Sequence, residues 1–88
     1  MPWTVRLSPS AEKQLSRFPR HHQLTIGKTI ERMVVDPFQG NVRSLQGKEW
    51  VGRFRRVVGD YRVIFAASHA QQIVEISQIL RRSEKTYR

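Results

Sequence analysis

Arginine is the residue type in this sequence with the clearest chemical capacity. The chain has 88 residues, of which 16 are Lys or Arg and 7 are Asp or Glu, so the formal net charge is +9. Twelve of the cations are arginines and four are lysines. A guanidinium binds phosphate through two parallel hydrogen bonds, whereas an ammonium acts as a point charge. A polyanion, most of all nucleic acid, is therefore the expected partner.

Three arginines fall where apolar and polar residues alternate on both sides of a short turn. Arg53 and Arg55 are two residues apart before Gly59, and Arg62 follows it. Alternation places Arg53 and Arg55 on one face of a strand and turns Arg62 away from the face of Tyr61. If the two strands pair through Gly59, the three arginines lie within about 10 Å of one another. They would bind an anion together, or else remain solvated on a half-exposed sheet.

Periodicity predicts the elements that position these arginines. Apolar residues alternate at the start of the chain, Ser8-Pro9 is a helix start, and Asp36-Pro37 is a helix stop. The predicted elements are a strand at 3–7, a helix at 8–18, a second helix at 20–36, a loop at 38–48, and strands at 50–58, 60–67 and 72–80. This order predicts one α+β domain over residues 1–88, with a helical hairpin packed on one face of a mostly antiparallel sheet.

Several classes of site are missing from the sequence. It has no cysteine, which excludes disulfides, thiolate zinc sites and cysteine nucleophiles, and its carboxylates are scattered. His21, His22 and His69 are expected at the surface, so neither a metal nor a cofactor is expected. No apolar run approaches the roughly 18–20 residues of a membrane span, and we expect a cytoplasmic protein without membrane contact.

The last residues offer one more chemical group. The chain ends Arg81-Arg82-Ser83-Glu84-Lys85-Thr86-Tyr87-Arg88. RNA cleavage through its own 2′-hydroxyl needs positioning, charge stabilisation and modest proton transfer, and arginine supplies the second of these. Tyr87 can take part in proton transfer, stack on a base, or pack against the sheet.

Several segments resemble the signature of RelE-type toxins. They are Leu45-Gln46-Gly47, Arg53-Phe54-Arg55, the stretch 59–65 that reads GDYRVIF, and the stretch 76–87, in which Arg81 stands six residues before Tyr87. With the opening strand and helical hairpin, the similarity covers essentially the whole chain. It implies the RelE/ParE fold, an antitoxin partner that forms a hetero-oligomer with the toxin, and ribosome-dependent cleavage of mRNA.

The resemblance also assigns roles to individual residues. Arg53 and Arg55 match the basic positions of the active strand, Arg62 the phosphate-stabilising arginine, Arg81 the arginine near the leaving group, and Tyr87 the tyrosine that stacks on a base or assists proton transfer. These five form the expected catalytic set. Further cations are expected to bind RNA: Arg43, Lys48, Arg56, Arg82 and Lys85.

Two positions depart from the pattern of that family. Some relatives have Lys where this chain has Arg53 and Arg55, and many have His where it has Ile79-Leu80. A lysine can lose its proton when its pKa is depressed, but an arginine cannot. Arg53 and Arg55 are therefore expected to stabilise charge, which leaves the general base to Tyr87, an unidentified residue or the ribosome.

Two other functions remain open from the sequence. One is a ParE-type toxin of the same fold that inhibits DNA gyrase, although such chains generally lack the full set of arginines and tyrosine. The other is a simple nucleic-acid-binding module, which would need exposed aromatic residues on the basic strands. Phe54 and Tyr61 are expected to face the core instead.

Overall fold

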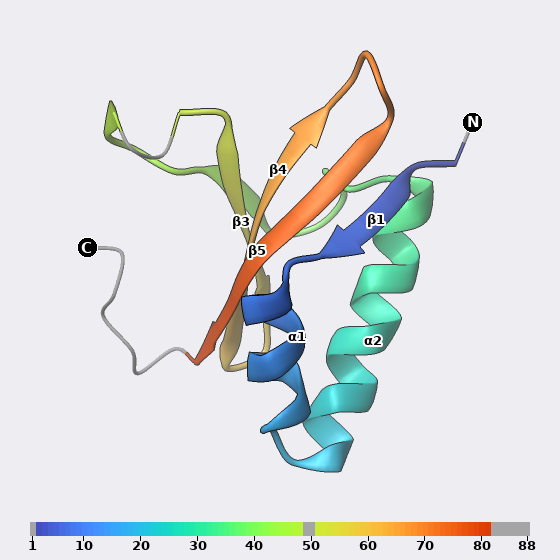
Figure 1. The fold of residues 1–88 in the computed structure, drawn as a ribbon, viewed down its shortest axis with the longest axis vertical. Helices are drawn as coiled ribbons and strands as arrows, with labels where there is room; N and C mark the ends of the chain where they lie inside the picture. Colours follow the sequence, from blue (N-terminus) through green and yellow to red (C-terminus); the bar gives the residue numbers. More distant parts are fainter. Residues whose placement is uncertain (1, 49–50, 82–88) are drawn as a thin grey trace.

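The computed structural model describes residues 2–48 and 51–81, and this part of the chain contains two helices and a five-stranded sheet. In chain order the elements are β1 (Thr4–Leu7), α1 (Pro9–Ser16), α2 (Arg20–Val35), β2 (Val42–Ser44), β3 (Arg53–Val58), β4 (Tyr61–Ser68) and β5 (Ile73–Arg81). The strands are arranged in the order β1-β5-β4-β3-β2. β2 to β5 are antiparallel neighbours, and β1 joins the far edge parallel to β5 (Figure 1).

The hairpin between β3 and β4 is closed by two residues. Val58 pairs with Tyr61, so Gly59 and Asp60 form the turn, and Gly59 has a φ of +56°. A positive φ at the first turn residue is typical of a type II′ turn, which glycine adopts without steric cost. This turn sets the register of the two strands that carry Arg53, Arg55 and Arg62.

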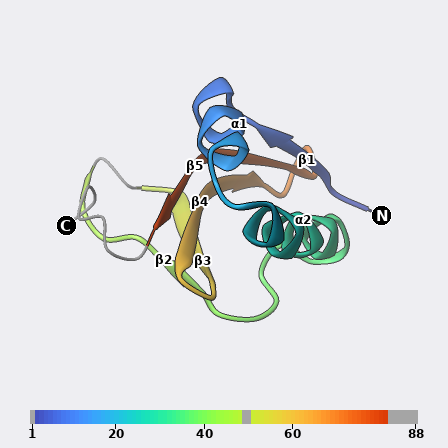
Figure 2. The ribbon, with the colours of Figure 1, turned by 90° about the horizontal axis from the view of Figure 1, so that it is seen from below.

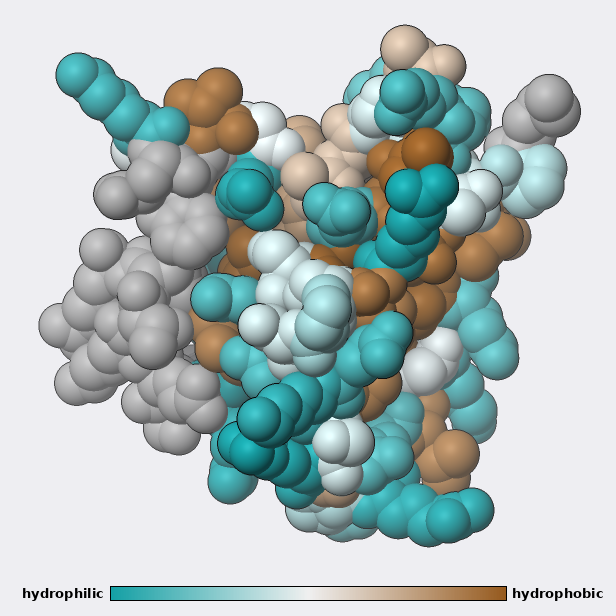
Figure 3. Space-filling view, in the orientation of Figure 1, coloured by the Kyte–Doolittle hydropathy of each residue, from teal (hydrophilic) through white to brown (hydrophobic). Residues whose placement is uncertain are grey.

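The two helices run antiparallel to each other and bury apolar residues in a common core. α2 lies on one side of the sheet, and α1 lies beside β5 and β1 (Figure 2). Hydrophilic side chains cover most of the face seen in Figure 3, with hydrophobic patches along the side where α2 lies. Leu24 and Val35 of α2 are 59% and 77% exposed.

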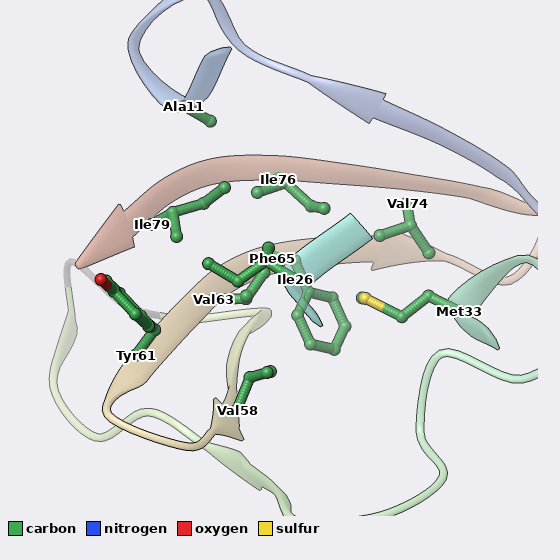
Figure 4. Close-up of a cluster of buried hydrophobic side chains, with 10 residues drawn as sticks. All are labelled: Ala11, Ile26, Met33, Val58, Tyr61, Val63, Phe65, Val74, Ile76 and Ile79. Carbon is green, nitrogen blue, oxygen red and sulfur yellow. The ribbon is translucent and has the colours of Figure 1, made fainter. Parts of the chain in front are cut away.

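The core is formed between α2 and the facing side of the sheet. Ile26 and Met33 of α2 approach Val63 and Phe65 of β4, and all four are fully buried (Figure 4). The other members of the cluster are Ala11, Val58, Tyr61, Val74, Ile76 and Ile79. Because side chains alternate along a strand, the residues of β3 and β4 that are directly next to these core residues in the sequence point to the opposite face of the sheet.

α1 begins at a serine that serves both the helix and the sheet. The Ser8 hydroxyl accepts a hydrogen bond from the Ala11 N–H at 3.0 Å and donates one to the Ser77 carbonyl at 2.8 Å. The Ile79 N–H donates to the Gln14 side-chain oxygen at 2.8 Å. β1 pairs with β5 only as far as Ile76, so α1 supplies partners to the edge of β5 beyond that point.

β5 contains an irregularity that changes which residues share a face. Ile64 pairs with Gln78 but Phe65 pairs with Ile76, so Ser77 is an extra residue in β5. Its hydroxyl donates to the Ile64 carbonyl at 3.3 Å. A bulge of this kind reverses the alternation of side chains along the strand.

The predicted fold class is confirmed, but the sheet is larger than expected. The predicted loop at 38–48 contains the strand β2, which pairs with β3, and β3, β4 and β5 begin at residues 53, 61 and 73. β2 has three residues, too few for alternation to show in a sequence. Its strand conformation depends on the hydrogen bonds of the neighbouring β3.

Candidate functional site

The face of the sheet opposite α2 carries arginines on three neighbouring strands. Arg43 of β2 pairs with Arg55 of β3, and Arg55 pairs with Ile64 of β4. Residues paired across strands share a face, and Ile64 lies between two residues that point into the helix-covered core. Arg43 and Arg55 therefore project from the face that the helices leave open.

Arg53 and Arg62 extend this group along the strands in opposite directions. Arg53 pairs with Ala66, and Arg62 pairs with Val57. Since Ala66 is four residues from Arg62 on β4, Arg53 and Arg62 are separated by about 13 Å along the strands. The separation of about 10 Å expected for all three arginines is therefore too short for this pair. We call Arg43, Arg53, Arg55 and Arg62 the arginine face.

Among residues 2–48 and 51–81, no carboxylate of the strands lies beside Arg62 at its end of the arginine face. The Nη1 atom of Arg62 is buried and has no hydrogen-bond partner among the described residues. Its neighbour across the strand on β5 is Leu80, which is 3% exposed. Glu75 is the carboxylate that the described strands place on this face. It pairs with Arg6 of β1 and with Ala66 of β4, which in turn pairs with Arg53, so it lies at the end of the face away from Arg62. An anion bound beside Arg62 would supply the acceptor that this guanidinium lacks.

Arg81 lies on the other face of the sheet. It pairs with Tyr61, whose side chain points into the helix-covered core. With strict alternation from Ile76, Arg81 would have shared the open face with Arg62, but the bulge at Ser77 reverses this. The structure therefore does not bring Arg81 together with the arginine face, and its catalytic role stays a prediction.

Arg81 instead lines a pocket at the end of α1. The pocket has a volume of about 400 Å³ and is lined by Gln14, Arg17, Phe18, Pro19, Tyr61, Ile79 and Arg81. Its floor is buried, since Tyr61 and Ile79 are 3% and 1% exposed. The Phe18 ring lies against the Tyr61 ring with centroids 4.5 Å apart. Arg17, which sequence reasoning did not select, is the second cation of this pocket.

Arg56 is also separated from the arginine face. It pairs with Val42 and Val63, so it points to the helix-covered side, and its Nη1 donates a hydrogen bond to the Gln39 carbonyl. Burial lowers the pKa of Arg56 from its ordinary value, and the charge of Arg32 lowers it further. Its predicted role in RNA binding stays a prediction, but it cannot share a phosphate with its neighbour Arg55.

The remaining expected site residues lie at the ends of the described ranges. Lys48 is exposed, and its carbonyl accepts a hydrogen bond from the Val51 N–H at 3.5 Å. Arg82, Lys85 and Tyr87 lie outside the described residues.

The histidines have aromatic neighbours. His22 is half-buried with its ring centroid 5.0 Å from that of Tyr61, and the rings of His21 and His22 are 4.0 Å apart. Exposed His69 stacks on Phe38 at 5.2 Å and meets the edge of Trp3. Within residues 2–48 and 51–81, no group of three or more potential metal ligands comes together.

Phe54 and Tyr61 face the core, as expected. The Phe54 ring lies 5.5 Å from that of Phe65 and 5.2 Å from that of Phe38. The described strands therefore offer arginines on the open face without a ladder of exposed aromatic rings, which single-strand binders use to stack bases.

Comparison with known proteins identifies the family. Residues 5–86 match the family model described as the ParE toxin of the type II toxin–antitoxin system parDE. The chain therefore belongs to this family and is a toxin of the RelE/ParE superfamily. No curated protein matches the sequence significantly.

Solved structures of related toxins share the fold. The toxin–antitoxin complex RelBE2 from Mycobacterium tuberculosis has a TM-score of 0.83 at 20% identity, covering 93% of this chain and 100% of that one. The archaeal RelE–RelB complex from Pyrococcus horikoshii gives 0.80 at 22% identity, covering 97% and 100%. The YoeB/ParE toxin from Agrobacterium tumefaciens gives 0.74 at 19% identity, covering 89% and 96%.

None of the helices in the described ranges is both long enough and apolar enough to cross a membrane.

Proposed function

We propose that the chain is a RelE-type toxin that cleaves mRNA on the ribosome. The observation that carries this proposal is the arginine face, which presents guanidinium groups from β2, β3 and β4 on one open side of the sheet. Four arginines spread over three neighbouring strands match a polymer of phosphates better than a single small anion.

The arginine face suits the charge changes of RNA cleavage. When the 2′-oxygen forms a bond to phosphorus and the bond to the 5′-oxygen breaks, negative charge grows on the non-bridging phosphate oxygens. We assign Arg62, and Arg55 on the next strand, to donate hydrogen bonds to those oxygens, because both guanidinium groups belong to the open face of the sheet.

Proton transfer must come from another group. A guanidinium stays protonated at any pH at which RNA is cleaved by an enzyme, so neither Arg53 nor Arg55 accepts the proton of the 2′-hydroxyl. We assign proton transfer to Tyr87 or to a group of the ribosome. If the ribosome supplies the base, ribosome dependence follows, because the arginine face stabilises charge without accepting a proton.

We further propose that a cognate antitoxin binds this toxin and silences it in a hetero-oligomer. The similar structures from Mycobacterium tuberculosis and Pyrococcus horikoshii are complexes of toxin with antitoxin. A formal charge of +9 on 88 residues also favours a partner that brings carboxylates.

A gyrase-inhibiting toxin is the alternative, and one observation favours it. The family model that matches residues 5–86 is that of the ParE toxin. In this case the arginines would bind a protein or protein-bound DNA, and no RNA bond would break.

Brief induction of the protein alone separates the two functions. Sequencing of mRNA 5′ ends is expected to show new ends within translated codons, together with a block of translation. Induction of the DNA-damage response with intact mRNA would contradict the nuclease and support gyrase inhibition.

Substitutions on the open face test the site. Arg62→Ala is expected to lower the cleavage rate about 100-fold, as loss of one donor to a developing oxyanion does. Arg6→Ala is the matched control. It removes one positive charge from the same face of the sheet, but on β1, where Arg6 pairs with Glu75. Tyr87→Phe tests proton transfer in the same assay. Full toxicity of both Arg62→Ala and Tyr87→Phe would show that the site is assigned wrongly.

A further inference from the structure

A second basic site lies where α2 ends and the chain turns toward β2. A hollow of about 470 Å³ is lined there by Arg32, Val35, Gln39, Gly40 and Arg56. Two of these residues are cations and none is an acid. Arg56 points to the helix-covered side of β3, so the sheet separates this hollow from the arginine face.

The Arg56 guanidinium is fixed in the hollow but is not fully paired. Its Nη1 donates to the Gln39 carbonyl, whereas its Nε is buried and has no hydrogen-bond partner among the described residues. Burial and the nearby charge of Arg32 both lower the pKa of Arg56, which means that its positive charge is disfavoured where it stands. A negative group between the two arginines would offset both effects.

Gly40 makes room for this arrangement. A Cβ on residue 40 would stand 2.8 Å from both Cζ and Nη2 of Arg56 and 3.2 Å from Nη1. These nearly equal distances place the position that a Cβ would occupy over the plane of the guanidinium. Its φ of +90° is also a conformation that other residues rarely adopt. The hollow, with the Arg56 guanidinium where it stands, therefore depends on a glycine at this position.

The rim of the hollow is apolar on the α2 side. Val35, which lines the hollow, is 77% exposed. A ligand that fits has a carboxylate for the two arginines and an apolar group for Val35. An Asp or Glu beside an apolar residue in a protein segment meets both requirements, whereas a phosphodiester chain meets only the first.

We propose that the hollow between Arg32 and Arg56 receives an acidic side chain of the antitoxin, with an adjacent apolar residue packed on Val35. This rests on the proposed antitoxin partner and is independent of whether the toxin cleaves mRNA or inhibits gyrase. The two basic sites then have different ligands. The arginine face binds phosphates, and this hollow binds a carboxylate of the antitoxin.

The experiment is a titration of the full chain followed by NMR. The probes are the blocked peptide acetyl-Leu-Glu-Leu-amide, its counterpart acetyl-Leu-Gln-Leu-amide, and uridine 3′-monophosphate. With the glutamate peptide, the Arg56 Nε–H and the Gly40 N–H are expected to shift saturably, and the glutamine peptide is expected to bind at least tenfold more weakly. Equal binding of the two peptides would overturn the proposal, and tighter binding of the nucleotide would assign the hollow to RNA instead.

Two variants identify the binding residues. Arg32→Gln is expected to weaken the glutamate peptide at least tenfold, and Lys28→Gln, one turn earlier on the exposed side of α2, is expected to leave it within twofold. Equal weakening by both would show attraction by net charge alone and overturn the site. The peptide titration uses only the purified toxin, so its result does not depend on whether the toxin cleaves mRNA. That proposal is tested separately, by mapping mRNA ends.

The antitoxin proposal has its own test. If no antitoxin exists, the toxin will stay active when it is expressed together with its neighbouring genes.

Discussion

At the scale of residues, adjacent arginines have different surroundings because of strand alternation. Arg55 pairs with Arg43 and Ile64 on the open face, while Arg56 lies on the opposite face and donates to Gln39. A guanidinium remains charged in both places, so the two arginines differ in the partners within reach and not in charge. Arg55 is accessible to a phosphate, whereas Arg56 binds a carbonyl of the protein itself.

This difference predicts how two neighbouring substitutions affect RNA binding. Arg55→Gln is expected to reduce the slope of log K against log salt by about 0.7 for single-stranded RNA, since one phosphate contact is lost. Arg56→Gln is the control and is expected to leave the slope unchanged. Fluorescence anisotropy with a labelled oligonucleotide over a range of salt concentrations measures both. An equal reduction in the two variants would show that Arg56 also reaches the RNA.

Glycine substitutions test the contact between Gly40 and Arg56. Gly40→Ala is expected to lower the free energy of unfolding by about 1–3 kcal/mol, because a left-handed conformation is costly for alanine and the new Cβ displaces the guanidinium. Gly27→Ala in α2 is expected to raise it by about 0.5–1 kcal/mol, since a Cβ there meets nothing within 4 Å. Urea denaturation measures both values, and a neutral Gly40→Ala would contradict the contact.

At the scale of elements, α1 acts as an extension of the sheet edge. β1 stops at Leu7, opposite Ile76, and Ser8 and Gln14 then supply partners to backbone groups of β5. The same segment of β5 contains the bulge at Ser77. The hydrogen bonds from α1 and its cap therefore stabilise the bulge at Ser77, and this bulge determines on which face of the sheet Arg81 lies.

The serine at the start of α1 is expected to contribute more than a helix cap normally does. Ser8→Ala removes an acceptor for the Ala11 N–H and a donor to the Ser77 carbonyl, and is expected to lower the free energy of unfolding by about 1–2 kcal/mol. Ser16→Ala is the matched control at the other end of α1, where the exposed hydroxyl only donates to Lys13, and its effect is expected within about 0.5 kcal/mol. Equal losses would contradict the special role of Ser8.

At the scale of the whole molecule, positive side chains far outnumber negative ones, with 16 Lys or Arg against 7 Asp or Glu. The net charge of +9 belongs to a small chain whose described part has a Cα radius of gyration of 12.2 Å. Many cations are therefore closer together than the Debye length of about 10 Å at 0.1 M salt. Mutual repulsion destabilises the free toxin, and a bound polyanion or acidic partner relieves it.

This repulsion predicts a stabilising effect of salt. Raising the KCl concentration from about 0.1 M to about 1 M, which shortens the Debye length to about 3 Å, is expected to raise the Tm of the free toxin. Lys28→Glu lowers the net charge from +9 to +7 (9 − 2) and is expected to show a smaller increase. Differential scanning calorimetry measures both, and a Tm that falls with salt would contradict net repulsion.

Much of the fold follows from local signals in the sequence. Ser8-Pro9 and Asp36-Pro37 bound the helical hairpin, and Gly59-Asp60 closes the hairpin of β3 and β4. The arginine face was also predictable in part, because a two-residue turn and strict alternation place Arg55 and Arg62 on one side. Each of these features is set by interactions within a few residues along the chain.

The sequence by itself thus determined the helices, the central hairpin and the side of the sheet on which Arg53, Arg55 and Arg62 lie. Only the tertiary structure decided that 42–44 is a strand, that the bulge at Ser77 turns Arg81 away from Arg62, and that Arg32 and Arg56 line one hollow. The physical reason is the range of the forces involved. Caps and turns are local, whereas an edge strand, a bulge and a pocket between α2 and β3 depend on hydrogen bonds and packing between segments far apart in the chain.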